Sequence, residues 1–308
     1  MQETRLISKS LLRKSFSSVA SPTKPKWLKI KLPSSKTLET KKVVNRQNLT
    51  TVCEEALCPN LNDCWSNKHA TFMILGDVCT RSCSFCNIQT GKPKSVDKFE
   101  PLKVAKAVKD LDLKHVVITS VDRDDLPDGG ALHFYKTIKM IKKFSPNISI
   151  EILTPDFKNK ENYLEIISSC EINVFNHNLE TVKNLYDIIR PGAEYLHSLS
   201  LLDSIKNINK NILTKSGVMI GLGEELIEIK ELFNDLRSVN VDFLTIGQYL
   251  RPSLNHCPVI KYYDQDYFDF LKKIATEIGF KAVTSSPFAR SSYKSVEEYE
   301  ILKSKIDH

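Results

Sequence analysis

The amino-acid sequence predicts an α/β fold built around a parallel sheet, and two observations lead to this prediction. Six short apolar segments rich in β-branched residues alternate with amphipathic helical segments along the 308-residue chain. Such an alternation is typical of a parallel sheet wound in one direction, either as a full or partial barrel or as an open doubly wound sheet. Hydrophobic residues make up 41% of the chain, which is enough for a sizeable core.

The expected strands are short apolar runs that lie between residues 71 and 246. They span residues 71–75, 115–120, 149–153, 172–175, 217–220 and 242–246, and the helices expected between them span residues 101–111, 131–144, 161–168, 180–189 and 224–239. The active sites of parallel barrels lie at the carboxyl ends of the strands. The segments in those positions contain cysteine, glycine and polar residues, so we expect one site at that rim.

The positive charge of the chain is concentrated in its amino-terminal part. Residues 1–50 contain 12 Lys and Arg residues against Glu3 and Glu39, whereas residues 51–308 have a net charge of −3. Proteins that bind nucleic acid usually carry positive charge on their folded surface, and no apolar run reaches the ~18 residues that span a bilayer. We therefore expect neither a nucleic acid nor a membrane as a partner. Residues 1–24 are expected to form a disordered basic arm, with a mitochondrial transit peptide as the alternative interpretation.

The cysteines are clustered in a way that favours metal binding over disulfide bonds. Six of the eight lie between residues 53 and 86, whereas disulfide frameworks are typical of short secreted chains. A reducing compartment is therefore expected, namely the bacterial cytoplasm or, as the alternative, the mitochondrial matrix. Cys170 and Cys257 lie outside the cluster and are expected to be ordinary thiols.

The most informative motif is the CX3CX2C triad formed by Cys79, Cys83 and Cys86. Three such thiols can hold three irons of a [4Fe–4S] cluster and leave the fourth iron open to another ligand. Structural zinc usually requires four ligands grouped in CX2C pairs, and only one CX2C is present. With Phe85 before the last cysteine and a strand before the loop, the motif resembles the radical S-adenosylmethionine superfamily. This resemblance implies that reductive cleavage of S-adenosylmethionine produces a radical that abstracts hydrogen from an unactivated carbon.

A second triad, Cys53, Cys58 and Cys64, precedes the first with the spacing CX4CX5C, in loop-like sequence that favours a second cluster over buried core thiols. Two such triads in tandem resemble the lipoyl synthase family. The resemblance extends from about residue 25 to residue 293. It includes VCEEALCP (52–59), ATFMILGDVCTRSCSFCN (70–87), HVVITSVDRDDLPDGGA (115–131), VFNHNLETV (174–182), TKSGVMIGLGE (214–224), DFLTIGQYL (242–250) and RSSY (290–293).

The resemblance implies a partial parallel (β/α)6 barrel of the radical S-adenosylmethionine type over residues 71–250. Residues 25–70 would form an amino-terminal extension that carries the second triad, and residues 251–308 a carboxyl-terminal extension that carries RSSY. The second serine of that motif, Ser292, is implied as the fourth ligand of the auxiliary [4Fe–4S] cluster. A serine alkoxide is a weak, hard ligand for iron, which suits a cluster that is dismantled as the sulfur source.

The family's activity is the insertion of sulfur at C6 and C8 of an octanoyl chain on a lysine of a lipoyl-carrier domain, with two S-adenosylmethionine molecules used per product. The implied carriers are the E2 subunits of 2-oxoacid dehydrogenases and the glycine-cleavage H protein. The implied accessory partners are an electron donor such as flavodoxin or ferredoxin and an iron–sulfur carrier. We further expect the basic arm to help dock an acidic carrier domain.

Two glycine-bearing turns follow expected strands, and the resemblance implies that they contact S-adenosylmethionine. Small residues there let the backbone approach a ligand closely. The residues implied are Gly129, Gly130, Gly221, Gly223 and Glu224. His177 also follows a strand, and either contacts substrate or nucleotide or is a hydrogen-bonded residue of the rim.

Two alternative functions remain open from the sequence. A radical methylthiotransferase also uses two clusters, but such enzymes carry additional domains at both ends. A zinc-binding interaction protein would hold zinc without labile sulfide. Lys294 and Ser295 replace the His-Ala pair that commonly follows RSSY in the family, at positions outside the implied cluster ligands.

Overall fold

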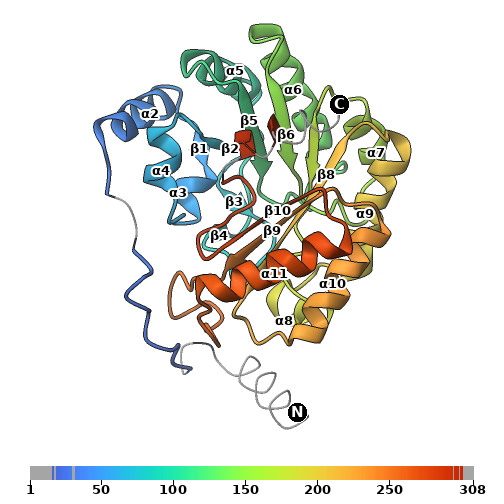
Figure 1. Cartoon of the computed structure of the whole chain (residues 1–308). Helices are drawn as coiled ribbons and strands as arrows, with labels where there is room; N and C mark the ends of the chain where they lie inside the picture. Colours follow the sequence, from blue (N-terminus) through green and yellow to red (C-terminus); the bar gives the residue numbers. More distant parts are fainter. Residues whose placement is uncertain (1–15, 17–18, 30–31, 294, 298, 301–308) are drawn as a thin grey trace.

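The computed structural model describes residues 16, 19–29, 32–293, 295–297 and 299–300. Its centre is an eight-stranded sheet with the order β1-β2-β5-β6-β7-β8-β9-β10, shown in Figure 1. Every neighbouring pair from β2 to β10 is parallel, and β1 pairs antiparallel with β2. The prediction of an α/β fold with a parallel sheet is therefore confirmed. Within the described residues, β1 and β10 form the two edges, so the sheet stays open.

All six expected strands are present. The strands of the sheet are β1 (Thr50–Thr51), β2 (Thr71–Ile74), β5 (His115–Ser120), β6 (Ser149–Leu153), β7 (Val174–Asn176), β8 (Leu213–Ile220), β9 (Phe243–Gln248) and β10 (Ala282–Ser286), and a separate small pair consists of β3 (Val78–Cys79) and β4 (Gln89–Thr90). The strand β10 was not predicted because its sequence, AVTSS, lacks a continuous apolar run. It extends the parallel sheet by pairing with β9.

The helices agree with the predicted pattern in four of the five expected places. Those with predicted counterparts are α5 (Glu100–Asp110), α6 (Ala131–Phe144), α7 (Tyr163–Ser168) and α10 (Leu226–Ser238). The expected helix over residues 180–189 is wrong over residues 180–182, which are not helical, and the rest of the span forms the short helices η2 (Lys183–Leu185) and α8 (Tyr186–Ile189). Glu180 has a left-handed backbone, with φ of 66°, and forms a bridge with Val218, so the chain cannot be helical there.

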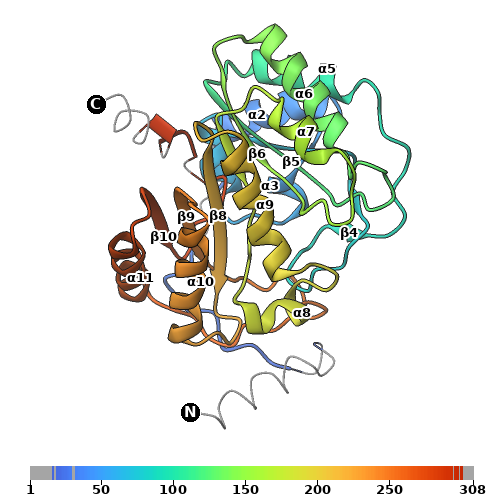
Figure 2. The same ribbon diagram turned by 90° about the vertical axis from the view of Figure 1, so that its right-hand side faces the viewer.

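Several helices outside the predicted alternation complete the fold. They are α2 (Ser35–Arg46), α3 (Val52–Glu55), α4 (Leu61–Ser66), α9 (Tyr195–Ile208) and α11 (Gln265–Ile278). The start of α11 is marked by Asp264, whose carboxylate accepts a hydrogen bond from the backbone N–H of Tyr267. Its apolar face, with Phe268 and Leu271, is buried, and Figures 1 and 2 show α10 and α11 beside β9 and β10.

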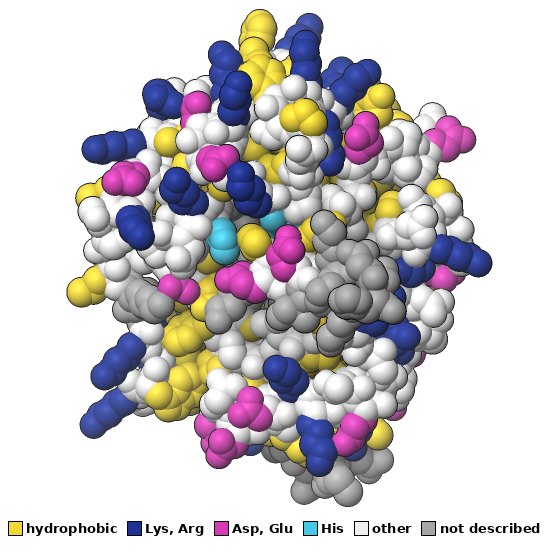
Figure 3. All heavy atoms as spheres, turned by 45° about the horizontal axis from the view of Figure 1, so that its top comes forward, with side chains coloured by type: hydrophobic (Ala, Val, Ile, Leu, Met, Phe, Trp, Pro, Cys, Tyr) yellow, Lys and Arg dark blue, Asp and Glu magenta, His cyan; other side chains and the backbone are white. Residues whose placement is uncertain are grey.

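The predicted basic arm, residues 1–24, lies mostly outside the described residues. Four lysines lie near the starts of parallel strands, since Lys109 and Lys114 precede β5 and Lys142 and Lys143 end α6, which leads to β6. Figure 3 brings this end forward and shows Lys and Arg side chains along its upper edge. No helix in the described part of the chain is both long enough and apolar enough to span a membrane.

Candidate active site

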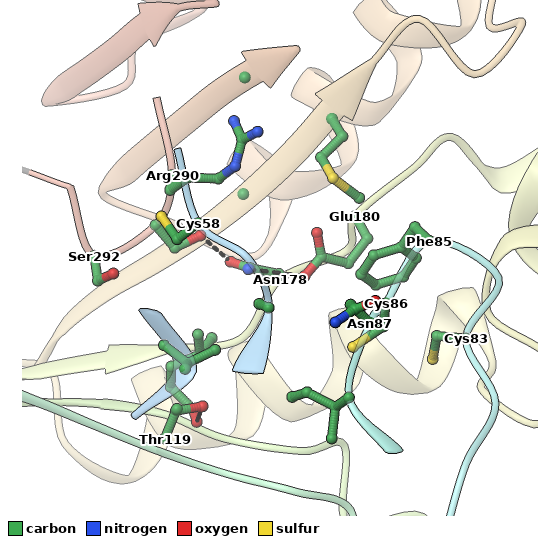
Figure 4. A pocket seen from close by; sticks show the side chains of 18 of the residues that line it. Cys58, Cys83, Phe85, Cys86, Asn87, Thr119, Asn178, Glu180, Arg290 and Ser292 are labelled. Carbon is green, nitrogen blue, oxygen red and sulfur yellow. Dashed lines mark hydrogen bonds between the residues drawn. The ribbon is translucent and has the colours of Figure 1, made fainter. Parts of the chain in front are cut away.

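A cavity of about 320 Å³ lies at the carboxyl ends of the parallel strands, where the alternation predicted a site. Five of the six clustered cysteines line it, together with Ser292 from near the other end of the chain. These residues are Cys53, Cys58, Cys79, Cys83, Cys86 and Ser292. Figure 4 shows Cys58 and Ser292 on one side of Asn178, with Cys83 and Cys86 on the other. The cavity therefore brings members of both triads to one space.

The first triad begins on the small β3–β4 pair and continues in the loop that follows. The Sγ atom of Cys79 accepts hydrogen bonds from the backbone N–H groups of Arg81, at 3.4 Å, and Asp122, at 3.3 Å. The backbone N–H of Cys86 donates to the carbonyl of Cys83 at 3.1 Å, which closes a turn between these two ligands. Backbone donors directed at a sulfur stabilise the thiolate form that binds iron.

Arg81 anchors this loop to the ends of two strands. Its guanidinium makes two hydrogen bonds to the carboxylate of Asp124, at 2.8 and 2.9 Å, and a third at 2.7 Å to Asp156, which is fully buried. Asp124 follows β5 and Asp156 follows β6. Burial would raise the pKa of Asp156, but the hydrogen bond and charge of Arg81 outweigh it and hold the pKa at about 2. The sequence did not point to Arg81, because its partners are distant along the chain.

The second triad lies on a compact turn of the amino-terminal extension. Cys53 is on α3, Cys64 is on α4, and Cys58 lies between them with its backbone N–H bonded to the carbonyl of Cys53 at 3.1 Å. Cys64 is half-buried and does not line the cavity, although its charge and those of Cys53 and Cys58 act on one another.

Residues 287–293, which we call the carboxyl-terminal strap, pack against this extension. The amide nitrogen Nδ2 of Asn60 donates to the carbonyl of Phe288 at 2.6 Å, and the hydroxyl of Tyr293 bonds to Asp63 at 3.0 Å. These contacts place the strap, with Ser292, beside the loops that carry the second triad.

Burial raises the pKa of every clustered thiol. The pKa rises to about 12 for Cys53, Cys79 and Cys83 and to about 11 for Cys86, and it is also raised for Cys58 and Cys64. Without a bound cation these thiols would stay protonated at neutral pH. A metal centre would supply the positive charge that stabilises them as thiolates, with release of their protons.

Two arginines and a carboxylate form the polar wall between the triads. The charge of Arg290 acts on Cys58, the charge of Arg190 acts on Cys83, and both act on Glu180. Burial nevertheless raises the pKa of Glu180, whose carboxylate accepts a hydrogen bond from the amide of Asn178 at 2.9 Å. Glu180 lies in the segment VFNHNLETV and Arg290 in RSSY, whereas Arg190 lies outside the segments that resemble the family, and the sequence predicted no role for any of the three. The left-handed backbone at Glu180 has no signal in a lone sequence.

The predicted glycine-bearing turns do not line the cavity. A Cβ atom on Gly130 would lie 2.3 Å from Cδ1 of Leu75, and this glycine caps α6 with φ of 93°. Gly129 and Gly223 also have a positive φ. The carboxylate of Glu224 accepts hydrogen bonds from the N–H groups of Gly221, at 2.6 Å, and Leu222, at 2.8 Å. Local packing thus accounts for Gly130 and the turn that Glu224 holds, and contact of these residues with S-adenosylmethionine stays a prediction.

His177 lines the cavity with both ring nitrogens engaged. Nδ1 lies 2.9 Å from the carbonyl of Thr154, and Nε2 lies 3.0 Å from the hydroxyl of Ser198. Burial and then the charge of Arg190 lower its pKa to about 4, so the ring is neutral. The geometry is that of a hydrogen-bonded rim residue. Cys170 and Cys257 are buried away from the cavity lining.

The donor set of the first triad fits an iron–sulfur cluster. Within the described residues, no three His, Cys, Asp or Glu side chains lie close enough together to hold a single metal ion. In a cubane cluster each thiolate binds a different iron, so its ligands surround a space instead of meeting at one ion. Cys79, Cys83 and Cys86 border such a space, and two backbone donors already point at one of the sulfurs.

The family description "Radical SAM superfamily" matches residues 73–236 of the chain. Among solved structures, SuiB from Streptococcus suis bound to S-adenosylmethionine is similar with a TM-score of 0.54 and 13% identity, over 71% of this chain and 50% of that one. Methylornithine synthase (PylB) has a TM-score of 0.53 and 12% identity, over 95% of this chain and 96% of its own. The maturase HydG from Carboxydothermus hydrogenoformans has a TM-score of 0.50 and 12% identity, over 99% and 82%. The chain spans half the length of that SuiB chain, and the structural matches show a shared fold.

Proposed function

The chain belongs to the radical SAM superfamily, and we propose that within this superfamily it is a lipoyl synthase. The observation that carries the proposal is that Cys53, Cys58 and Ser292 line the same cavity as Cys79, Cys83 and Cys86. An enzyme that generates a carbon radical and then captures it with sulfur needs the radical source and the sulfur source to face one substrate.

Each part of the cavity has a role in this proposal. Cys79, Cys83 and Cys86 would hold the cluster that binds S-adenosylmethionine, and Cys53, Cys58, Cys64 and Ser292 would hold the auxiliary cluster that is consumed as sulfur donor. When bound, these groups supply a hydrogen-abstracting radical and the sulfur atoms. Apolar residues that line the same cavity, including Leu153, Val218 and Met219, would bind the octanoyl chain and exclude water from the radical.

The arginines that line the cavity support the assignment of one cluster to each cysteine triad. A buried cluster with thiolate ligands carries negative charge, which needs compensation in a low-dielectric site. Arg290 lies near Cys58 and Arg190 lies near Cys83, so one guanidinium is available on each side of the cavity. The proposed partners are octanoylated lipoyl-carrier domains, an electron donor such as flavodoxin or ferredoxin, and an iron–sulfur carrier.

The test is anaerobic turnover of an octanoyl-lysyl peptide with dithionite and S-adenosylmethionine, followed by mass spectrometry. The reconstituted protein should hold about eight iron and eight sulfide per chain, and the peptide should gain two sulfur atoms. Cys58→Ala should abolish sulfur insertion while 5′-deoxyadenosine is still formed. Cys170→Ala, at a buried thiol outside the cavity, is the matched control and should retain both reactions.

Two results would contradict the proposal. One is a wild-type protein that holds about four iron per chain and leaves the peptide unmodified. The other is a Cys58→Ala variant that still inserts sulfur, because the auxiliary cluster would then not be the donor. Zinc without labile sulfide would instead point to the zinc-binding interaction protein.

A further inference from the structure

The carboxyl-terminal strap, residues 287–293, crosses two neighbouring strands at positions occupied by glycine. Gly217 lies on β8 and Gly247 on β9, and these strands pair with Met219 opposite Gly247. Neither glycine has a positive φ, so an alanine would suit the backbone at both positions. The absence of a side chain there has to be explained by what lies above the strands.

The strap occupies the space that side chains would take. A Cβ atom on Gly247 would lie 2.2 Å from the carbonyl oxygen of Ala289 and 2.9 Å from Nη1 of Arg290. A Cβ atom on Gly217 would lie 2.6 Å from Oγ of Ser291 and 2.8 Å from Oδ1 of Asn178. These separations are shorter than van der Waals contact, so either substitution would displace the strap or its neighbours.

Hydrogen bonds fasten the strap on both sides of these glycines. The backbone N–H of Gln248 donates to the carbonyl of Pro287 at 3.2 Å, and the hydroxyl of Ser291 donates to Oδ1 of Asn178 at 2.8 Å. Beyond the strands, Asn60 and Tyr293 tie the strap to the amino-terminal extension. Because it is held at several points, the strap cannot rise at Gly247 without disturbing the segment that ends in Ser292 and Tyr293.

We propose that Gly217 and Gly247 are positioning residues that let the strap approach the sheet and so bring Ser292 to the second triad. The inference rests on the proposed function, in which Ser292 completes the auxiliary site. Neither glycine has a side-chain donor atom, but both would decide whether Ser292 reaches the auxiliary cluster. The first triad lies on a different loop, and the strap hydrogen bonds named above do not involve it, so we expect it to keep its place when the strap moves.

Gly247 and Gly217 differ in which atom a new side chain would meet. At Gly247 the obstacle is a backbone carbonyl, which no side-chain substitution removes. At Gly217 the nearest obstacle is the hydroxyl of Ser291, which Ser291→Ala removes. The Gly217→Ala defect should therefore be partly rescued in the Gly217→Ala/Ser291→Ala double variant. The matched control is Gly91→Ala, because a Cβ atom there would meet only Cγ1 of Val78, at an ordinary 3.5 Å, and φ is not positive.

The experiment uses the anaerobically reconstituted full chain and three measurements. Iron and sulfide per chain report cluster occupancy, 5′-deoxyadenosine formation reports the first cluster, and amide hydrogen exchange over residues 287–293 reports the strap itself. For Gly247→Ala we expect iron to fall from about eight to about four per chain, with 5′-deoxyadenosine formation within about twofold of wild type. Exchange in the strap should be at least about tenfold faster. Gly91→Ala should match wild type in all three.

The outcomes separate the inference from the proposed function. A wild-type chain with only about four iron defeats the proposed function, and the inference fails with it. A wild-type chain with about eight iron, together with a Gly247→Ala variant of wild-type iron content and exchange, overturns the inference alone. If Gly247→Ala does not fold, Gly217→Ala takes its place: a fall to about four iron per chain with faster exchange in the strap supports the inference, and wild-type iron content and exchange refute it.

Discussion

Replacement of Arg81 by methionine tests how the first triad is held in place. Arg81 lies between Cys79 and Cys83, its side chain is 9% exposed, and its partner Asp156 is 0% exposed. Removing one member of a buried ion pair leaves an uncompensated charge, which costs about 3–5 kcal/mol. We therefore expect Arg81→Met to lose about 3–5 kcal/mol of the free energy of unfolding at pH 7 and to bind less iron, because the ligand loop loses its anchor.

The assay is urea unfolding of anaerobically purified protein, with iron per chain measured in parallel. Arg46→Met is the matched control, because it breaks an ion pair with Asp110 in which the side chains are 63% and 36% exposed. A surface pair of this kind is worth less than about 1 kcal/mol.

The double variant Arg81→Met/Asp156→Asn removes both charges and should recover much of the loss. An Arg81→Met variant that costs no more than Arg46→Met, or that gains nothing from Asp156→Asn, would refute the reasoning. In the first case the ion pair would not be a buried one in solution. In the second, the cost would arise from packing instead of charge.

Three further outcomes are expected. The pKa of His177 is lowered to about 4 by burial, so the unfolded chain takes up a proton near pH 6.5 before the folded one does, and stability falls as the pH drops from 6.5 toward 4. In urea unfolding, the free energy of unfolding of His177→Gln should fall by about 2 kcal/mol less than that of wild type between pH 7 and pH 5. The same pH dependence in both proteins would contradict a buried neutral ring. After iron is removed, the thiols of Cys79 and Cys83, with pKa values near 12, should react with iodoacetamide at pH 8 at least about tenfold more slowly than free cysteine, and alkylation at the rate of free cysteine would show that their pKa values are not raised. Deletion of residues 1–15 should raise the KM for an acidic carrier domain and weaken its salt dependence without changing kcat. This deletion spares Val19 and Ser21, whose oxygen atoms bind the guanidinium of Arg251, and an unchanged KM would exclude the arm from docking.

The parts of the fold that were predictable are those with local signals. Strand β5 contains the apolar run Val116–Ile118, β6 contains Ile150, Ile152 and Leu153, and α6 has an apolar face and a predicted span identical to the observed one. The strand β10 has two serines and a threonine in five residues, so only its pairing with β9 makes it a strand. Glu180 falls in a segment with helical composition, but its left-handed backbone and its bridge to Val218 depend on β8.

In the candidate site, too, the predictable features are those with local signals in the sequence. Both cysteine triads could be recognised from their spacing, because ligands of one cluster on one loop must lie within a few residues of one another, and a cluster at the second triad stays a prediction. The roles of Arg81, Arg290 and Glu180 could not be predicted, since their charge partners come from other strands and extensions. The glycine-bearing turns at 128–130 and 221–224 were expected at a ligand, whereas hydrogen bonds within each turn and the packing of Gly130 against Leu75 account for much of their sequence.

The sequence by itself determined the α/β alternation, the positions of the two cysteine triads and, through the CX3CX2C triad, membership of the radical SAM superfamily. These properties are local, because strand periodicity and ligand spacing are read over a few consecutive residues. Only the tertiary structure decided that the strap with Ser292 lies beside the second triad, that five clustered cysteines share one cavity, and that Gly217 and Gly247 leave room for the strap. Those relations join residues that are far apart along the chain, and their physical basis is close packing between segments, which no spacing in the sequence records.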